Sequence, residues 1–258
     1  MTRICIKVGS NVLTRADGSL DATRQSALVD QIADLYKQGY EVLLVSSGAV
    51  ACGRSVLHHR NDLRTKDTVD ERQLFSAVGQ AKLIDRYYEL FREHGITVGQ
   101  VLTMKENFVS EEHRRTQQNC MEVMLQNGVI PIINENDTVC VTELMFTDND
   151  ELSGLVAQMM QCQRLIILSN IDGIYTGDPS DPASELIRYV HPGDNLQQYI
   201  QTKKSSLGRG GMQSKCHIAQ MVAQSDIEVV IANGKHENIL LKILKDPLDV
   251  PCTRFVCG

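Results

Sequence analysis

The segment VIPIINEND, residues 129–137, joins an apolar run of strand length to four consecutive amide and carboxylate side chains. A second polar cluster, DND, follows at residues 148–150. An apolar run of this kind is typical of a buried strand, and buried parallel strands present ligands at their carboxyl ends. Because polar groups removed from water are costly unless they hold water, a metal or a polar substrate, we interpret the two clusters as a binding site rather than as ordinary Asx-rich turns.

Strand and helix patterns alternate on both sides of this segment. The strands have little polar–apolar alternation, so helices should cover both faces of the sheet that they form. We expect an α/β fold, a three-layer α/β/α sandwich with a mainly parallel central sheet, in which residues 173–209 break the pattern as a turn-rich surface excursion. The predicted strands are residues 3–8, 41–46, 97–104, 129–133, 164–168 and 228–232, and the predicted helices are 21–38, 70–93, 110–127, 151–161 and 211–224.

The chain has 258 residues, which is enough for one large α/β domain with a full core. No Gly/Ser-rich or Pro-rich linker divides it. We therefore expect a single domain, residues 1–258, with an N-terminal lobe of about residues 1–150 and a C-terminal lobe of about residues 151–258.

The composition argues against several classes of protein. A net charge of −6 without a long basic stripe argues against nucleic acid as a partner. The sequence has no membrane-length apolar run and no signal peptide, so we expect a soluble, cytoplasmic protein without a membrane partner. The eight cysteines are scattered and form no C-x-x-C pair, so we expect most of them to be reduced core residues and expect no metal site.

Four further segments place glycine or small polar residues directly after predicted strands or before helices. Lys7 is followed by Gly9 and Ser10 at the end of the first strand, where backbone amides can approach an anion. Ser47 and Gly48 follow the second strand and enter a helix, whose free amides favour negative charge.

The other two segments lie in the C-terminal half. The stretch GRGGMQSK, residues 208–215, leads from glycines into a helix that carries a lysine in its first turns, which suits a polyphosphate. Ser169 and Asn170 follow the strand at 164–168 and suit a nucleoside or ribose. The P-loop, Rossmann and α/β-hydrolase motifs are absent from the sequence, and the histidines at 58, 59 and 113 lack partners at ligand spacing.

Together and in this order, the segments resemble the motifs of the amino acid kinase family, and within it those of members that phosphorylate glutamate. The resemblance runs from residue 3 to about residue 251 and rests on K-x-G-S, S-S-G-A, I-N-E-N-D, D-N-D and G-G-M-x-[ST]-K. It implies ATP-dependent phosphorylation of the γ-carboxylate of L-glutamate to L-glutamyl 5-phosphate, the first step of proline biosynthesis, with Mg²⁺ as the accompanying ion.

The resemblance also implies a role for each motif. Lys7 and Lys215 would contact the phosphates and the transferring group, and Asp150 would hold both lysines in place. Two positions differ from the residues that are frequent in the family, because Asn170 replaces an Asp and Arg209 replaces a Thr, so contacts to adenine or ribose could differ. The implied glutamate-binding residues are Ser47, Gly48, Asn134, Asp137, Asp148 and Asn149, and the implied ATP-binding residues are Lys7, Gly9, Ser10, Ser169, Asn170, Arg209, Gly210, Gly211, Met212, Gln213, Ser214 and Lys215.

The chemistry of this reaction suits the residues. A γ-carboxylate has a pKa of about 4.3 and is ionised at neutral pH, so its attack on a phosphoryl group needs no general base. It needs in-line positioning and cations around the transferring group. Asp137 would distinguish free glutamate, which carries an α-ammonium group, from N-acetylglutamate, which does not.

Alternatives remain within the family and outside catalysis. N-acetylglutamate kinases, aspartokinases, uridylate kinases and carbamate kinases share the phosphate apparatus, and a regulatory nucleotide-binding subunit could keep the fold without turnover. The I-N-E-N-D loop favours glutamate, and retention of Lys7, Asp150 and Lys215 favours catalysis. The resemblance further implies a homo-oligomer (dimer or tetramer), feedback inhibition by proline through residues 52–70, and channelling to glutamyl phosphate reductase. Many bacterial members carry a C-terminal PUA domain, which we do not expect in this sequence.

Overall fold

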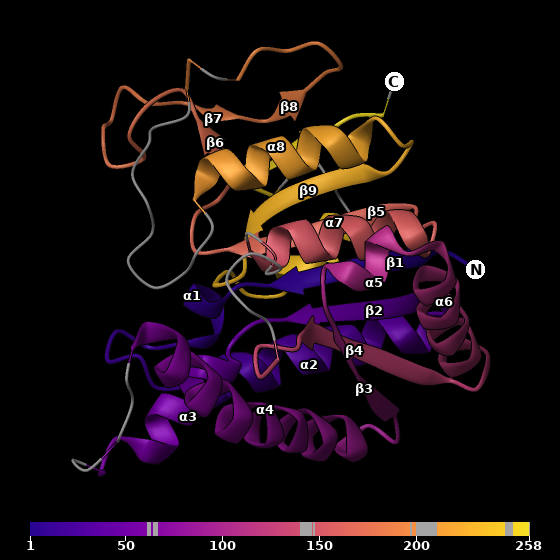
Figure 1. The fold of residues 1–258 in the computed structure, drawn as a ribbon. Coiled ribbons are helices and arrows are strands. Elements are labelled where there is room, and N and C mark those ends of the chain that lie inside the picture. The colour runs from indigo at the N-terminus through magenta and orange to yellow at the C-terminus, as the bar shows by residue number, and fades with distance from the viewer. Residues whose placement is uncertain are drawn as a thin grey trace.

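The computed structural model describes residues 1–60, 63, 67–139, 146, 148–196, 198–199, 211–245 and 250–257. Within these residues an eight-stranded sheet runs through the whole molecule (Figure 1). Its strands, in spatial order, are β3 (Thr97–Thr103), β4 (Val129–Glu135), β2 (Glu41–Ser46), β1 (Arg3–Val8), β5 (Arg164–Ser169), β9 (Glu228–Asn233), β10 (Cys252–Phe255) and β8 (Tyr189–Val190).

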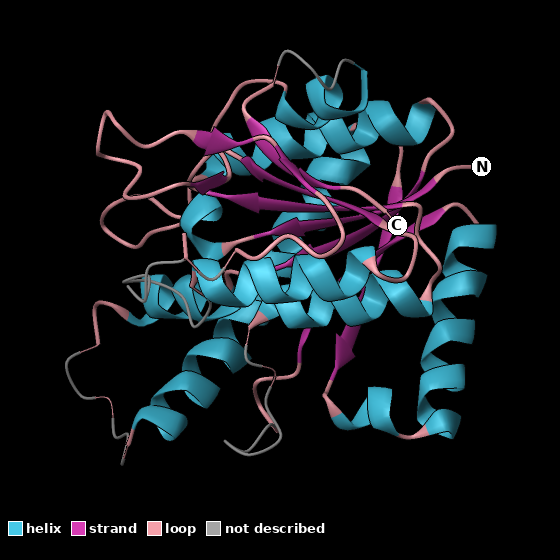
Figure 2. Ribbon diagram, turned by 90° about the horizontal axis from the view of Figure 1, so that it is seen from above, coloured by secondary structure: helices cyan, strands magenta, loops and turns pink. Residues whose placement is uncertain are grey.

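Helices cover both faces of the sheet, as Figure 2 shows from above. On one face α2 (Ala22–Lys37), α4 (Thr68–Glu93) and α9 (Ile239–Lys245) form a core with alternate strand residues such as Ile4 and Ile6. On the other face α6 (Glu111–Gln126), α7 (Asn149–Met159) and α8 (Met212–Ala223) pack on the intervening residues, among them Cys5. The expected three-layer α/β/α sandwich is therefore confirmed.

The predicted strands and helices are all present, to within two residues at either end. The first six strands in spatial order run parallel, while β10 pairs with β9 in antiparallel orientation. The sequence patterns missed short elements, which carry too few residues for a periodicity. These are the hairpin of β6 (Ile174–Tyr175) and β7 (Leu186–Ile187), the last two strands of the sheet, β10 and β8, and the helices α1 (Ser10–Leu13), α5 (Glu106–Val109) and α9. Helix α3 (Ala49–Leu57) follows Gly48 as expected.

The parallel strands end together at one edge of the sheet. Val8 at the end of β1 is in register with Ser46 on β2 and with Leu168 on β5. From β1 the chain proceeds to β2, β3 and β4 on one side and then crosses to β5 on the other side. Such a reversal of strand order opens a crevice at the carboxyl ends, and this is the usual position of ligands in open α/β sheets.

Helices α3 and α4 approach each other backbone to backbone through two glycines. A Cβ atom on Gly79 would lie 1.8 Å from the carbonyl oxygen of Ala49, and one on Gly53 would lie 1.8 Å from the carbonyl oxygen of Phe75. Neither oxygen can move without moving a helix. The contact fixes α4 against α3, and both helices reach the carboxyl-end crevice.

We predict that Gly79→Ala destabilises the protein by about 1–3 kcal/mol or more, because the added methyl group must push the two helix backbones apart. Urea unfolding measures the change. Ala77→Ser is the matched control, since it also adds one heavy atom to α4 but at an exposed position, and it should stay within about 0.5 kcal/mol of wild type. Equal stability of Gly79→Ala and wild type would contradict the close backbone approach.

Candidate active site

A cavity of about 720 Å³ occupies the crevice at the carboxyl ends of the parallel strands. Its lining comes from the ends of β1, β4 and β5, from the turn after β2 and from the helices that follow or flank these strands. The residues singled out from the sequence that line it are Lys7, Gly9, Ser10, Ser47, Gly48, Asn134, Asp137, Asp148, Asn149, Asp150, Ser169, Asn170, Gly211, Met212 and Lys215. Gln213 and Ser214 do not line the cavity, and Arg209 and Gly210 lie outside the described residues.

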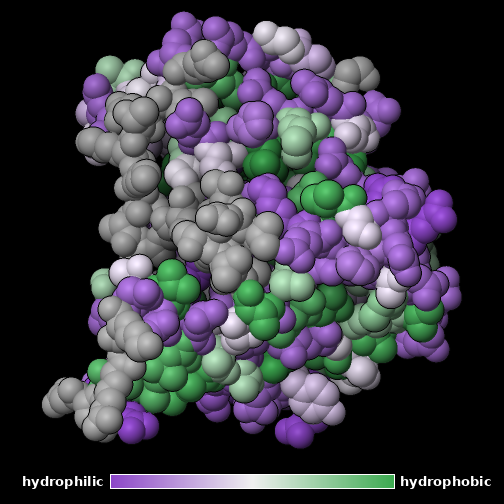
Figure 3. All heavy atoms as spheres, viewed as in Figure 1, coloured by the Kyte–Doolittle hydropathy of each residue, from purple (hydrophilic) through white to green (hydrophobic). Residues whose placement is uncertain are grey.

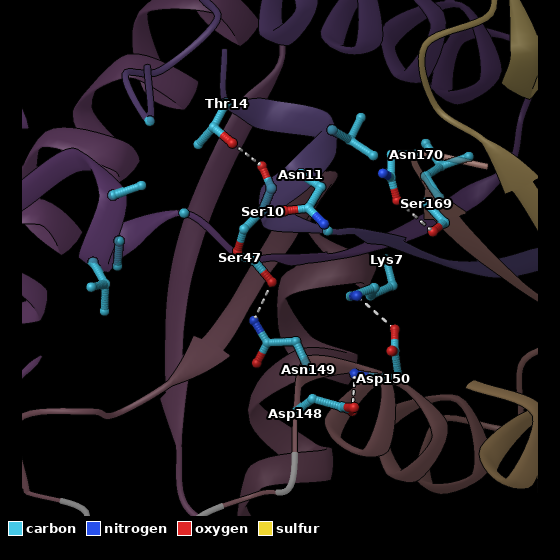
Figure 4. Close-up of a pocket in the computed structure, with 18 of the residues that line it drawn as sticks. Lys7, Ser10, Asn11, Thr14, Ser47, Asp148, Asn149, Asp150, Ser169 and Asn170 are labelled. Carbon is cyan, nitrogen blue, oxygen red and sulfur yellow. Dashed lines mark hydrogen bonds and ion pairs between the residues drawn. The ribbon is translucent and has the colours of Figure 1, made fainter. Parts of the chain in front are cut away.

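The cavity floor holds a buried carboxylate between two ammonium groups. Asp150 is fully buried, and its two oxygens contact Lys7 Nζ at 2.5 Å and Lys215 Nζ at 2.7 Å. Figure 4 shows Lys7 and Asp150 pointing toward one another. Burial by itself raises the pKa of the Asp150 carboxyl, but the two ammonium groups outweigh it and hold the pKa below its ordinary value. The cluster therefore carries one positive charge more than negative, at the point where three elements, β1, α7 and α8, converge.

Helices α3 and α8 begin at the cavity without a side-chain cap, as does the four-residue helix α1 after Gly9. Gly48 precedes α3 in the left-handed conformation, with φ of 112°, and Gly211 precedes α8, and neither has a side chain that could accept from the first-turn amides. In contrast, the side chains of Asp21, Asp67 and Ser110 cap α2, α4 and α6. Free amides and the helix dipole at a helix start favour an anion. The two glycine caps thus leave donors for phosphate or carboxylate groups.

An amide relay crosses the cavity from α4 to the end of β2. Gln80 Oε1 accepts from Asn134 Nδ2 at 2.8 Å, and Asn134 Oδ1 accepts from Asn149 Nδ2 at 3.0 Å. Asn149 Nδ2 also donates to Ser47 Oγ at 2.8 Å (Figure 4). Three of these residues were singled out from the sequence, and the relay explains why they lie together although they come from different elements.

Asp148 links the starts of α7 and α8. Its carboxylate caps α7 by accepting from the amides of Asp150 at 2.9 Å and Glu151 at 3.0 Å. It also accepts from Ser214 Oγ at 2.6 Å. This position of Ser214 accounts for its absence from the cavity lining. A direct contact between Asp148 and glutamate stays a prediction, beside the capping role that the sequence did not indicate.

Sequence reasoning missed the partners of Asp137. Arg72 Nη2 donates to Glu135 Oε2 at 3.1 Å and contacts Asp137 Oδ1, and Ser76 Oγ donates to Asp137 Oδ2 at 3.1 Å. Arg72 also lines the cavity. Arg72, Ser76 and Gln80 follow one another at four-residue spacing, so a polar stripe along the predicted helix 70–93 was the signal that could have revealed them.

The nucleotide end predicted from Ser169 and Asn170 lies at the carboxyl end of β5, next to Gly9. The amide of Gly9 donates to Leu168 O at 3.2 Å, and a Cβ atom at Gly9 would lie 3.4 Å from Lys7 Nζ. A side chain there would crowd both the strand end and the lysine. Gly9 therefore keeps the space beside Lys7 open to the cavity.

Among the described residues, no group of three or more His, Cys, Asp or Glu side chains could hold a metal ion. None of the helices in the described part of the chain is both long and apolar enough to cross a membrane. Five cysteines are buried, as expected, while Cys120 is exposed and Cys140 lies outside the described residues. Burial raises the pKa of Cys52, Cys162 and Cys216 to about 12, so these thiols stay protonated at neutral pH.

The protein combines a mainly parallel sheet with glycine-capped helices and a pair of lysines that share one buried carboxylate at the floor of the cavity. The sequence model of the amino acid kinase family matches residues 2–233, and the chain belongs to this family. The solved carbamate kinase from Giardia lamblia bound to AMP-PNP has the same fold, with a TM-score of 0.72 at 14% identity over 100% of this chain and 99% of that chain.

Curated relatives narrow the comparison to glutamate 5-kinases. The glutamate 5-kinase of Bacteroides thetaiotaomicron is 67% identical over 255 residues, which are 99% of this chain and 70% of that protein. The glutamate 5-kinase of Chlorobaculum tepidum is 46% identical over 93% of this chain and 66% of that protein. The chain thus spans about two thirds of the length of these two relatives.

We predict that Asp150→Asn lowers stability at neutral pH by about 3–5 kcal/mol, because two ammonium groups lose their buried counter-charge. The folded-state pKa of Asp150 lies below the ordinary value of about 3.9, so in acid the unfolded chain binds more protons than the folded chain. The stabilising contribution is therefore complete above about pH 5 and is lost as the pH falls through the folded-state value.

Melting temperatures of wild type and Asp150→Asn measured from about pH 3 to pH 7 check this, and their difference should shrink below about pH 4. Asp17→Asn is the control, because hydrogen bonds from Ser19 lower the pKa of Asp17 as well but its carboxyl is exposed. A difference for Asp150→Asn that stays constant over the whole range would contradict the charge pairing.

Proposed function

We propose that the chain transfers the γ-phosphoryl group of ATP to the γ-carboxylate of L-glutamate and forms L-glutamyl 5-phosphate for proline biosynthesis. The observation that carries the proposal is the Lys7–Asp150–Lys215 cluster, which lies in one cavity with the amide relay of Asn134, Asn149 and Ser47. The identity of 67% to a glutamate 5-kinase supports glutamate as the acceptor. The same identity disfavours an N-acetylglutamate kinase and an aspartokinase-like enzyme. The lysine–aspartate cluster disfavours a non-catalytic subunit.

The chain's own residues supply position and charge. Lys7 and Lys215 carry the surplus positive charge that would stabilise the transferring phosphoryl group and the bridging oxygens. Asp150 holds both ammonium groups in place and is too well paired to act as a base. The amides at the starts of α3 and α8 donate to carboxylate or phosphate oxygens. Because the acceptor carboxylate is already ionised, the described groups need only align it with the phosphorus atom.

The ATP end of the site would be formed by Gly9, Ser10, Ser169, Asn170 and the start of α8. The two carboxylates at this end, Asp148 and Asp150, are engaged by protein donors. A Mg²⁺ ion would therefore take its ligands mainly from phosphate oxygens and water, as is common for this ion. When bound, Mg²⁺ neutralises charge on the phosphates.

We predict that Lys7→Ala and Lys215→Ala each lower kcat about 10²-fold or more, with a smaller change in ATP affinity, because the interaction strengthens in the transition state. Lys→Arg at either position should also be poor, since a planar guanidinium cannot replace a compact ammonium group. Glutamate-dependent ADP release, with hydroxylamine to trap the acyl phosphate as a hydroxamate, measures the reaction.

Lys82→Ala is the matched control, because Lys82 is exposed on α4 and pairs with Asp85 at 3.6 Å away from the cavity. It should keep wild-type kcat. Normal kcat in both Lys7→Ala and Lys215→Ala would reject their catalytic role, and absence of ADP release with glutamate in the wild type would reject the proposed acceptor.

We extend the proposal to feedback inhibition by proline, competitive with glutamate. Helices α3 and α4, which flank the connecting part of residues 52–70, both contribute cavity-lining arginines, Arg54 and Arg72. We infer that an occupant of the cavity is sensed within residues 52–70, of which residues 61–62 and 64–66 lie outside the described part of the chain. We predict that glutamate saturation curves shift to higher KM as proline is added, with unchanged kcat. Curves that overlay one another at all proline concentrations would eliminate the idea.

The proposal also includes a homo-oligomer, cytoplasmic location and delivery of the product to glutamyl phosphate reductase. Hydrophobic side chains gather over the lower part of the face in Figure 3, where α3 and α4 lie, and Tyr88 on α4 and Leu102 on β3 are exposed apolar residues that a dimer or tetramer could cover. A monomer mass measured by light scattering would contradict the oligomer.

Acyl phosphates hydrolyse readily in water, so direct delivery of the product to the reductase would protect it. Cell fractionation tests the cytoplasmic location, and co-purification of the reductase tests the contact between the two enzymes.

A further inference from the structure

Helix α4 supports the turn that joins β2 to α3. A Cβ atom at Gly48 would lie 3.9 Å from Leu83 Cδ1, which is an ordinary van der Waals contact. One helical turn further along α4, the hydroxyl groups of Tyr87 and Ser46 are 2.8 Å apart. Both of these side chains are buried, with exposed fractions of 2% and 0%. A buried hydrogen bond therefore lies next to Ser47 and Gly48, which line the cavity.

The direction of this hydrogen bond follows from the atoms around it. Ser46 Oγ is 3.0 Å from Ser47 O, and a carbonyl oxygen can only accept, so the Ser46 hydroxyl donates to it. Because a hydroxyl group has a single hydrogen, Tyr87 must be the donor in its contact with Ser46 Oγ. Burial raises the pKa of Tyr87 to about 12, so the phenol keeps its hydrogen at neutral pH. The relay of donors runs from Tyr87 through Ser46 to the Ser47 carbonyl.

The Ser47 carbonyl belongs to the same peptide group as the Gly48 N–H. In a trans peptide group the C=O and N–H bonds point in opposite directions. A carbonyl that is held toward the buried Ser46 hydroxyl thus turns the Gly48 N–H away from the core. Gly48 lines the cavity on its exposed side and precedes the uncapped start of α3. The relay therefore sets the direction of a donor at the cavity wall.

Building on the proposed function, in which the turn at Ser47 and Gly48 binds glutamate, we propose that Tyr87 is a positioning residue for a carboxylate of that substrate. Tyr87 touches no substrate itself. It fixes the Ser46 hydroxyl, the hydroxyl fixes the Ser47 carbonyl, and the carbonyl fixes the direction in which the Gly48 N–H donates. Hydrogen bonds to charged acceptors depend on direction, so the relay serves the affinity for the carboxylate.

Other contacts hold the remaining groups of the turn. Ser47 N donates to Val8 O at 3.1 Å, and Ser47 Oγ accepts from Asn149 Nδ2 at 2.8 Å. These bonds fix the nitrogen and the side chain of Ser47, whereas the orientation of the next peptide group depends on ψ of Ser47 and φ of Gly48. Glycine restricts such rotation less than any other residue does. A hydrogen bond to the carbonyl of that peptide group supplies the missing restraint.

The first experiment removes only the hydroxyl group of the tyrosine. For Tyr87→Phe we expect KM for glutamate to rise about 10-fold, because a misdirected N–H loses much of its hydrogen bond to a charged acceptor, while KM for ATP changes less than about 2-fold. Glutamate-dependent ADP release measures both constants. Tyr36→Phe is the matched control, since Tyr36 OH donates to Gly128 O at 3.0 Å, just before β4 begins and at the opposite edge of the sheet from the cavity. It should keep both KM values of wild type.

Ser46→Ala changes the middle member of the relay and serves as the second variant if Tyr87→Phe folds poorly. It should raise KM for glutamate at least as much as Tyr87→Phe does. The double variant should be no worse than Ser46→Ala alone, because the tyrosine acts through the serine. Melting temperatures are measured for every variant. Loss of a tyrosine hydrogen bond lowers the melting temperature of Tyr87→Phe and Tyr36→Phe alike, so the KM for glutamate separates positioning from stability.

Three results would overturn the assignment. Unchanged kinetic constants in Tyr87→Phe, or an equal rise of KM for glutamate and for ATP, would make Tyr87 a residue of the core only. Additive effects in the double variant would mean that the tyrosine does not act through Ser46. An active wild type with any of these results rejects this inference alone. A wild type that forms no hydroxamate from glutamate rejects the proposed function and this inference with it.

Discussion

The contact of Asp150 with Lys7 and Lys215 is the interaction on which the rest of the site depends. Each group is unfavourable without the others, because a fully buried carboxylate needs a cation and two neighbouring ammonium groups need an anion between them. The three residues come from β1, α7 and α8, so the same contact joins three segments that are far apart in the sequence at the crevice. The two ammonium groups and the one carboxylate together have a net charge of +1, and this charge faces the cavity.

A second ionic cluster lies at the carboxyl end of β4. There Arg72 contacts both Glu135 and Asp137. Fixed charges at two separate places in one cavity can orient a ligand that itself carries charges of both kinds. Electrostatic complementarity of this type serves specificity more than affinity.

Glycine makes this arrangement possible in two ways. At Gly48 and Gly211 it starts helices without a capping side chain, so that their amides face the cavity. At Gly53 and Gly79 it lets α3 and α4 touch along their backbones, which places the polar stripe of α4 against the INEND loop. The first pair serves binding directly, and the second pair serves it through the position of a helix.

The sequence by itself determined the layers of the sandwich, the long elements and the segments that meet in the cavity, because buried strands and amphipathic helices have periods that a linear pattern records. It also indicated Lys7, Asp150 and Lys215 through family motifs. It did not reveal the partners of Asp137, the capping role of Asp148, or the short strands β10 and β8 at one side of the sheet. Those depend on which side chain of α4 faces which residue of β4, on how closely two helices can approach, and on how strands distant in the chain pair. Tertiary structure alone decided them, because each is a contact between elements whose relative placement follows from packing of the whole core.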